Sequence, residues 1–240
     1  MSQDSATGDA SVPPVSSETH RRKKTPKGPV KRSLSKRVFY FIVRYSSQVV
    51  GVLVFGLRCH GREHLPDEGS GLVVSTHQSH FDPVLVGVTF NERLNYLARR
   101  SLFKNKLFGL LISMLDAIEL DRDRSGLAGI KETMVRVRRG EKVLMFPEGT
   151  RTSTGRIAEL KPGFISIARR CKAPLIPMAI VGAFEALPKG AKVPVRSPLR
   201  VWVGEPITPD EFLKLEDDEL LKLVSQRLHS CDQRARLSFG

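Results

Sequence analysis

Residues 72–90, LVVSTHQSHFDPVLVGVTF, contain one complete unit of the fold that we expect for this chain. The apolar run at residues 72–74 predicts a buried strand, and the apolar residues of 83–90 recur at helical spacing. Between them, Asp82 followed by Pro83 is typical of a helix start, with Asp82 at the N-cap and Pro83 in the first turn. The stretch is therefore interpreted as a strand, a polar turn and a helix.

The same alternation continues along the rest of the chain. Short apolar runs predict strands at residues 72–74, 95–98, 118–120, 143–146, 175–181 and 199–203. Apolar residues at helical spacing predict helices at residues 83–90, 102–115, 127–139 and 163–171. Such alternation indicates an α/β fold with a central, mostly parallel sheet flanked by helices. Further on, Thr208 and Glu211 form the pattern of a capping box, and the apolar helical face that follows is assigned to packing.

Length, charge and cysteine content restrict the class of protein. The 240 residues are 40% hydrophobic, which is enough for one domain with a sizeable core. The formal net charge of +14 indicates anionic partners, such as phospholipid surfaces, phosphorylated small molecules, acidic proteins or nucleic acid. The three cysteines lack the spacing of a metal site or a disulfide framework, which favours a reducing compartment. Because no apolar run follows Met1 directly, a cleaved secretory signal is not expected.

Two segments precede the α/β domain, which we place at residues 59–240. Residues 1–37 lack apolar periodicity and gather basic residues, so we interpret them as a disordered basic arm, the alternative being a solvated tail without a partner. Residues 38–58 are apolar and aromatic, but polar residues within 44–48 disfavour a helix that spans a membrane. We expect a helix or helical hairpin in the membrane interface, with a buried helix of the soluble core as the alternative.

Polar clusters follow three of the predicted strands, at residues 77–82, 121–122 and 147–151. In an open α/β sheet, ligands bind beyond the carboxyl ends of the strands. If the strands are parallel, these three clusters face one common site.

The first cluster contains the candidate catalytic pair. A tight turn would bring His77 and Asp82 together, and a carboxylate on one ring nitrogen leaves the other nitrogen free to remove a proton from an alcohol. The alternative is a hydrogen-bonded loop pair without a catalytic role. His80 is interpreted as a turn residue, and a metal site is disfavoured because no further His or Cys cluster would complete it.

The second cluster, with the sequence FPEGTR, is suited to binding an anion. Gly149 permits close approach of the backbone, Thr150 donates a hydrogen bond, and Arg151 can grip phosphate with two N–H groups. Glu148 is unusual in a phosphate pocket, so we expect it to orient Arg151, another base or the turn itself. Arg122 is a further candidate phosphate ligand, or else part of a surface ion pair.

Taken together, these motifs resemble those of the glycerophospholipid acyltransferase family, specifically the 1-acylglycerol-3-phosphate acyltransferases. The resemblance rests on His77 and Asp82 separated by four residues, on residues 146–151 and on PLIP at residues 174–177, and it covers about residues 60–205. It implies transfer of a fatty acyl group from acyl-CoA or acyl-carrier protein to the free hydroxyl of lysophosphatidic acid, giving phosphatidic acid in phospholipid biosynthesis. It implies neither a resident cofactor nor an acyl-enzyme intermediate.

The resemblance also assigns roles by position. It implies that His77 is the general base and Asp82 its partner. The implied acceptor-binding residues are Arg122, Glu148, Gly149, Thr150 and Arg151. The implied location is the cytoplasmic face of a membrane. This chain departs from the family within residues 116–122, where a glycine and an aromatic residue are common, and at Thr152, where serine is common, and both departures bear on the identity of the acceptor.

Other functions compete with this one. A nucleic-acid binder is disfavoured because the basic arm has no interleaved aromatic residues and the chain shows no helix-turn-helix or zinc-finger spacing. A catalytically silent, basic membrane-binding protein would share the same composition. Among enzymes, the alternative is an acyltransferase for another acceptor, such as a different lysophospholipid, an aminolipid or glycerol 3-phosphate.

Overall fold

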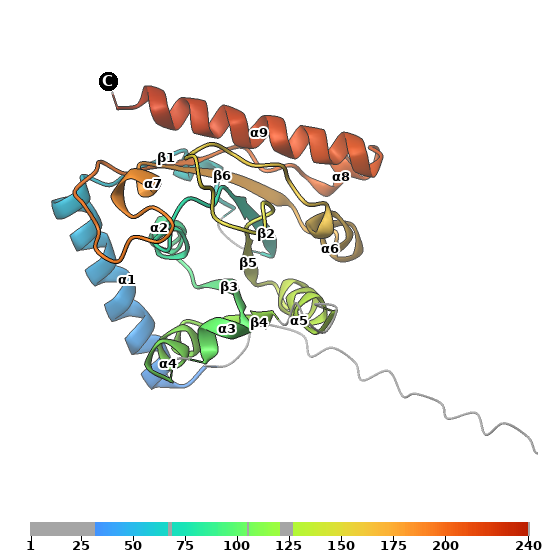
Figure 1. Ribbon diagram of the computed structural model, residues 1–240. Helices are drawn as coiled ribbons and strands as arrows, with labels where there is room; N and C mark the ends of the chain where they lie inside the picture. The colour runs from blue at the N-terminus through green and yellow to red at the C-terminus, as the bar shows by residue number, and fades with distance from the viewer. Residues whose placement is uncertain (1–31, 67–68, 105, 121–126, 240) are drawn as a thin grey trace, which may run out of the picture.

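In the computed structural model, the described residues form one seven-stranded sheet covered by helices (Figure 1). The structure describes residues 32–66, 69–104, 106–120 and 127–239. The strands are β1 Arg58–His60, β2 Gly71–Ser75, β3 Leu94–Arg99, β4 Ala117–Leu120, β5 Lys142–Met145, β6 Leu175–Val181 and β7 Arg200–Val203. Their order is β1-β7-β6-β2-β5-β3-β4, and within this described sheet only β6 and β7 pair in antiparallel fashion. The predicted, mostly parallel α/β sheet is confirmed.

Helices precede the sheet, connect most of its strands and follow its last strand. They are α1 Leu34–Phe55, α2 Asp82–Thr89, α3 Arg100–Phe103, α4 Lys106–Met114, α5 Leu127–Arg138, α6 Gly163–Cys171, α7 Ala183–Ala186, α8 Pro209–Phe212 and α9 Asp217–Leu237, with a short 3-10 helix at Arg62–His64. The segment predicted as one helix over residues 102–115 contains two, α3 and α4. Strand β1 was not predicted.

Two apolar cores lie on opposite faces of the sheet. The side chains of β2 alternate between them, since Leu72 and Val74 pack in the core with α5, α6 and α9, and Val73 packs in the core with α2. All three side chains are fully buried. A parallel strand covered on both faces reads as a continuous apolar run, which is why residues 72–74 were recognisable in the sequence.

The C-terminal helices begin with side-chain caps. The Thr208 hydroxyl accepts a hydrogen bond from the Glu211 backbone N–H at 3.3 Å, so the predicted cap is present, but the helix that it starts is the four-residue α8. Helix α9 has a capping box of its own, formed by Glu216 and Glu219. The apolar face of α9 covers the sheet, which agrees with the packing role assigned to this segment.

Helix α1 turns most of its large apolar side chains outward and Arg44 toward the domain. Ten apolar side chains of α1 are each at least 38% exposed: Leu34, Val38, Phe41, Ile42, Tyr45, Val49, Val50, Val52, Leu53 and Val54. Inward, Arg44 donates hydrogen bonds to the backbone carbonyls of Phe90 at 2.9 Å and Val88 at 3.5 Å. Within the described residues, α1 alone is long and apolar enough to cross a membrane by length and composition.

These exposures do not fit a buried helix of the soluble core, which was the alternative for this segment. The helix begins at Leu34, four residues before the expected start, and continues without a break to Phe55. Residues 1–31 of the predicted basic arm lie outside the described residues, so the arm stays a prediction.

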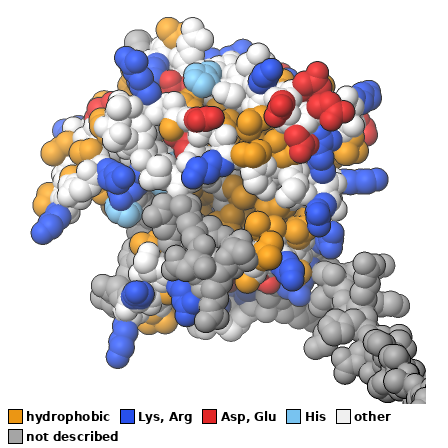
Figure 2. Space-filling view, turned by 45° about the vertical axis from the view of Figure 1, so that its right-hand side comes forward, with side chains coloured by type: hydrophobic (Ala, Val, Ile, Leu, Met, Phe, Trp, Pro, Cys, Tyr) orange, Lys and Arg blue, Asp and Glu red, His pale blue; other side chains and the backbone are white. Residues whose placement is uncertain are grey.

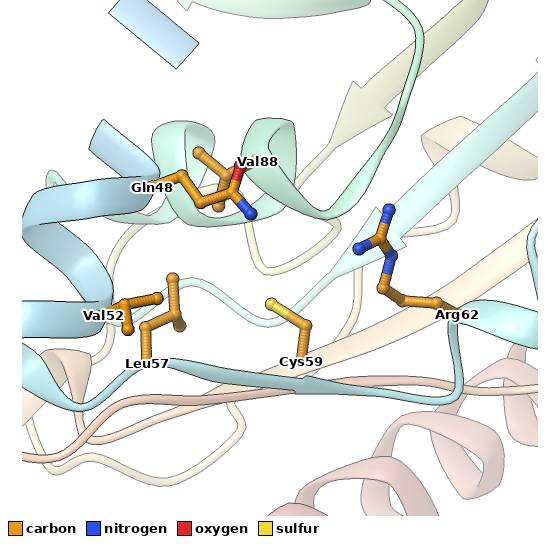
Figure 3. Close-up of a pocket in the computed structure, with 6 residues that line it drawn as sticks. All are labelled: Gln48, Val52, Leu57, Cys59, Arg62 and Val88. Carbon is orange, nitrogen blue, oxygen red and sulfur yellow. The ribbon is translucent and has the colours of Figure 1, made fainter. Parts of the chain in front are cut away.

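A small pocket separates α1 from α2 and from the sheet edge at β1 (Figure 3). Its volume is about 160 Å³. It is lined by Gln48, Val52, Leu57, Cys59, Arg62 and Val88. Gln48 reaches it from α1, so this member of the polar group within residues 44–48 faces the protein.

An ionic cluster fixes the start of α1 to the amino end of the sheet. The Arg32 guanidinium donates to the Asp116 carboxylate at 2.5 Å and to the Glu141 carboxylate at 2.8 Å. Arg93 pairs with the same Asp116 carboxylate at 2.9 Å. All four side chains are at most 17% exposed, so desolvation strengthens the attraction between their charges. The chain is therefore tied to the domain just before α1 begins.

Candidate active site

The turn after β2 and the loop after β5 lie side by side. These two strands are parallel neighbours, with Val74 opposite Met145, so the segments that leave their carboxyl ends start next to each other. The structure thereby brings residues 77–82 together with residues 146–152. The third predicted cluster, including Arg122, lies outside the described residues.

His77 and Asp82 form a hydrogen-bonded pair. The His77 Nδ1 atom lies 2.8 Å from Asp82 Oδ2, and Asp82 is fully buried. The same oxygen accepts the backbone N–H of Gln78 at 2.5 Å and of Ser79 at 2.8 Å. Two backbone donors and the His77 ring nitrogen therefore converge on one carboxylate oxygen.

The expected position of Asp82 at the N-cap of α2 is wrong. Asp82 is the first residue of the helix, Phe81 occupies the N-cap, and no side chain caps this end. The reason is the geometry of the tight turn, which points its backbone N–H groups at the Asp82 carboxylate. The carboxylate therefore binds the turn and His77 instead of the helix terminus.

The imidazole of His77 is held in a defined orientation. Its ring stacks on the Phe146 ring with centroids 3.9 Å apart and planes 13° from parallel. The His77 side chain is 19% exposed, and its Nε2 atom has no hydrogen-bond partner among the described residues. One ring nitrogen is therefore bound to Asp82 and the other is available to a ligand, as proton transfer requires.

The electrostatics of the pair follow from its burial. Burial raises the pKa of Asp82, while the hydrogen bond and charge of His77 and the N–H groups of Ser79 and Gln78 act in the opposite direction. Asp82 Oδ1 is buried without a hydrogen-bond partner in the described structure.

Glu148 clamps the backbone of residues 77–82, the turn that holds the candidate catalytic pair and is called the catalytic turn below. One of its oxygens accepts the His77 N–H at 2.7 Å, and the other accepts the Ala158 N–H at 2.9 Å. The His77 carbonyl in turn accepts the Thr152 N–H at 2.8 Å. Glu148 is 3% exposed, and burial raises its pKa against the effect of these two N–H donors. Of the roles left open for Glu148, the geometry favours holding the turn over contact with the acceptor.

The remaining residues of the second cluster form a basic rim. Gly149 adopts a φ of 71°, a conformation that favours glycine, and a Cβ atom built there would lie 3.3 Å from the Lys161 side chain. Thr150 is exposed. Arg151 is half-buried, and its Nη1 atom is buried without a hydrogen-bond partner in the described part of the chain. Two cations, Arg151 and Lys161, are thus available at this loop.

Sequence reasoning missed the residues that support the site. Lys161 was not identified, although a basic residue just before Pro162, the N-cap of α6, was a usable signal. The Gln78 side chain accepts the Phe184 N–H at 3.2 Å and donates to the Gly155 carbonyl at 3.4 Å. No sequence signal marks such bonds, because their partners are distant along the chain.

His80 lies on the exposed side of the catalytic turn. Partial burial lowers its pKa, and the nearby positive charges of Arg151 and His77 lower it further. Its position in the turn agrees with the interpretation of His80 as a turn residue. Among the described residues, no group of three His, Cys, Asp or Glu side chains is arranged to hold a metal ion.

Comparisons with known proteins identify relatives of this chain. The model of a family described as "Acyltransferase" matches residues 56–181. A 1-acyl-sn-glycerol-3-phosphate acyltransferase of Bacillus subtilis is 30% identical over 175 residues, which are 72% of this chain and 85% of that protein. The chloroplastic 1-acyl-sn-glycerol-3-phosphate acyltransferase BAT2 of Brassica napus is 27% identical over 176 residues, 72% of this chain and 51% of that protein.

A solved structure shares the fold. The crystal structure of the 1-acyl-sn-glycerophosphate acyltransferase PlsC from Thermotoga maritima matches with a TM-score of 0.72 and 22% sequence identity. The match covers 85% of this chain and 83% of the other chain.

Proposed function

Because the chain belongs to the acyltransferase family, we propose that it transfers a fatty acyl group from acyl-CoA or acyl-carrier protein to the free hydroxyl of 1-acyl-sn-glycerol 3-phosphate. The product is phosphatidic acid. The observation that carries the proposal is the His77–Asp82 pair, clamped by Glu148 and open to a ligand at Nε2. The names of the relatives support the choice of acceptor.

The chemistry follows from the two ends of the imidazole. His77 Nε2 takes the proton of the acceptor hydroxyl while that oxygen attacks the thioester carbonyl, and Asp82 stabilises the resulting imidazolium. A carbon–oxygen bond forms, the carbon–sulfur bond breaks, and the proton on His77 passes to the departing thiolate. Because the acceptor attacks the thioester directly, no acyl-enzyme forms. The clamp on the His77 backbone and the Phe146 stack contribute by keeping Nε2 in position.

We assign the acceptor phosphate to the basic rim. Arg151 has a buried Nη1 atom without a hydrogen-bond partner in the described structure, and phosphate oxygens are suitable acceptors for it. The Lys161 side chain lies over Gly149 and adds a second positive charge. Thr150 is exposed beside them and can donate its hydroxyl. The contribution of Arg122 stays a prediction.

We further propose that the enzyme lies on a phospholipid surface through α1. A largely apolar outer face suits a helix lying in the interface, with the domain on its other side. Crossing the bilayer would detach Arg44 from the two carbonyls that it binds, which favours the interfacial position. The free cysteines Cys59, Cys171 and Cys231 support a reducing compartment, and hence the cytoplasmic face.

One experiment tests the proposed reaction. The purified protein is incubated with an isotope-labelled acyl thioester and, separately, with lysophosphatidic acid, other lysophospholipids and glycerol 3-phosphate, and the products are identified by mass. We expect the label to appear in phosphatidic acid. Among the acceptors, lysophosphatidic acid should give the highest rate and the lowest KM. A different preferred acceptor would contradict the proposed substrate, and absence of any acylated product would contradict the proposed reaction.

A further inference from the structure

The segment between α7 and β7 forms an exposed basic loop, which we call the 188–198 loop. Every residue from 189 to 196 is exposed. The loop carries Lys189, Lys192 and Arg196, and no acidic residue occurs between positions 186 and 204. Val193 and Val195 are 74% and 59% exposed. Cations mixed with exposed aliphatic side chains are the composition of a surface that contacts anionic headgroups and the outer edge of the acyl region.

The two ends of the loop are attached beside α1 and the catalytic turn. At its start, the Leu187 carbonyl accepts the Ser79 hydroxyl at 2.9 Å. At its end, the Leu199 N–H donates to the carbonyl of Phe55, the last residue of α1, at 3.0 Å. The Phe55 ring packs edge-on against Phe81 of the catalytic turn, with centroids 5.8 Å apart. Figure 1 accordingly shows the orange loop beside the upper end of α1.

A large group of acidic residues lies away from the 188–198 loop, so it does not repel an anionic surface from the loop. Five acidic residues belong to α8 and the first turn of α9: Asp210, Glu211, Asp217, Asp218 and Glu219. Figure 2 shows acidic side chains gathered on one corner of the molecule, and Figure 1 places α8 on the side away from α1. Glu185, the acidic residue nearest to the loop in sequence, precedes its first attachment point.

Helix α1 supplies apolar area but few cations of its own. Lys36 and Arg37 stand at its start, and Arg44 is turned inward to bind backbone carbonyls. The three cations of the 188–198 loop lie next to the other end of the helix. Stable attachment to a membrane usually takes two signals, for which an apolar element with a basic patch is one combination.

We propose that the 188–198 loop is a second membrane contact, which binds anionic lipid headgroups while Val193 and Val195 enter the interface. The protein then contacts the membrane through the outer face of α1 and through the 188–198 loop, which lies at the C-terminal end of α1. The catalytic turn lies beside this loop. This inference rests on the membrane location proposed above. Because a lysolipid acceptor resides in the bilayer, the contact also places the catalytic turn close to the surface that holds its substrate.

The test measures binding of the full chain to vesicles of phosphatidylcholine, with and without phosphatidylglycerol. The variant Lys189→Gln/Lys192→Gln/Arg196→Gln is compared with wild type at low salt. Each cation near an anionic surface accounts for roughly fivefold in binding, so we expect a loss of roughly 100-fold on vesicles with phosphatidylglycerol and little change on phosphatidylcholine alone. A second variant, Val193→Ser/Val195→Ser, should weaken binding to both kinds of vesicle.

The matched control removes three exposed cations elsewhere, in the variant Arg170→Gln/Lys214→Gln/Lys222→Gln. It changes the net charge equally but lies on α6, on α9 and between α8 and α9, so it should keep nearly wild-type binding. Equal losses in the two triple variants would overturn the proposal in favour of general charge attraction.

Unchanged binding of the loop variant to vesicles with phosphatidylglycerol would also overturn it. Because this assay measures binding without turnover, it separates failure of the loop proposal from failure of the proposed reaction.

Discussion

Replacing Glu148 with glutamine tests whether this residue holds the catalytic turn. The carboxylate accepts two backbone N–H groups, from His77 at 2.7 Å and from Ala158 at 2.9 Å. A glutamine has one acceptor oxygen, so its NH₂ group must face one of these N–H donors. A hydrogen bond to a charged group contributes about 1.5–3 kcal/mol, so the free energy of unfolding should fall by about that amount. Glu148→Ala loses both bonds and should cost about twice as much.

The effect on catalysis follows from the movement of His77. If its backbone shifts by about 1 Å, the proton transfer should slow by roughly 100-fold, seen as a lower kcat with little change in the KM for the acceptor. The assays are steady-state kinetics on lysophosphatidic acid and urea unfolding of the same preparations. Glu159→Gln is the control, because Glu159 is exposed on the same loop and should leave both measurements unchanged. A raised acceptor KM with unchanged kcat and stability would refute the clamp and assign Glu148 to substrate binding.

The pH dependence of stability gives a separate check on Glu148. Burial raises its pKa in the folded state, so the folded protein holds this proton more tightly than the unfolded chain. Its contribution to the free energy of unfolding is fully present below the ordinary Glu pKa of about 4.3 and is lost as the pH rises through the raised value. The free energy of unfolding should therefore fall less steeply with rising pH in Glu148→Gln than in wild type. An identical fall in the two proteins would contradict the buried setting of Glu148.

Four further predictions concern the His77–Asp82 pair, the basic rim and α1. Asp82→Asn should lower kcat by roughly 10⁴-fold, as in a triad that loses its carboxylate, and a loss below tenfold in steady-state kinetics would contradict the pairing. Arg151→Ala should raise the KM for the phosphorylated acceptor by roughly 10- to 100-fold and that for the donor much less, whereas equal rises would mean that it holds the loop. Phe41→Ser/Tyr45→Ser should weaken vesicle binding at unchanged unfolding free energy, because both side chains are at least 65% exposed. Vesicle binding unaffected by the Phe41 and Tyr45 changes would contradict the membrane face. Arg44→Ala should instead lower the free energy of unfolding by about 1–3 kcal/mol, because two hydrogen bonds to backbone carbonyls are lost.

The sequence was informative where burial is complete on both sides of a strand. Residues 72–74 read as a strand because β2 lies between β6 and β5 and is covered on both faces. By contrast, β1 has the sequence Arg58–Cys59–His60, stands at the sheet edge and depends on its pairing with β7. A three-residue strand whose partner lies far along the chain has no local pattern to predict it. The strand order itself does not follow the chain, so it was not accessible from local signals.

The site was predictable as a set of residues but not as a geometry. Sequence patterns identified His77, Asp82 and the loop containing Glu148, because polar residues followed apolar strands. They placed Asp82 at a helix cap, whereas the backbone N–H groups of the turn bind its carboxylate. They left the role of Glu148 open, because its partners depend on β2 and β5 being neighbours. The stacking of Phe146 on His77 has the same origin.

The membrane segment shows why composition alone was ambiguous. Its polar residues interrupted an apolar run, which disfavoured a spanning helix. The sequence did not show whether these residues point toward the domain or away from it. The structure turns Arg44 and Gln48 toward the domain and the large apolar side chains outward. The orientation of these side chains depends on which face of α1 packs against the domain. That face is set by contacts with α2, which the sequence of α1 alone does not reveal.

The central claim is that His77 removes the proton from the acceptor hydroxyl, and the turnover of His77→Ala tests it most directly. The variant and the wild type are given the same labelled acyl thioester and lysophosphatidic acid, and phosphatidic acid is quantified by mass, with vesicle binding measured in parallel. The account predicts no product above the enzyme-free rate, with vesicle binding unchanged. Turnover close to wild type in a folded, vesicle-bound His77→Ala protein would contradict it.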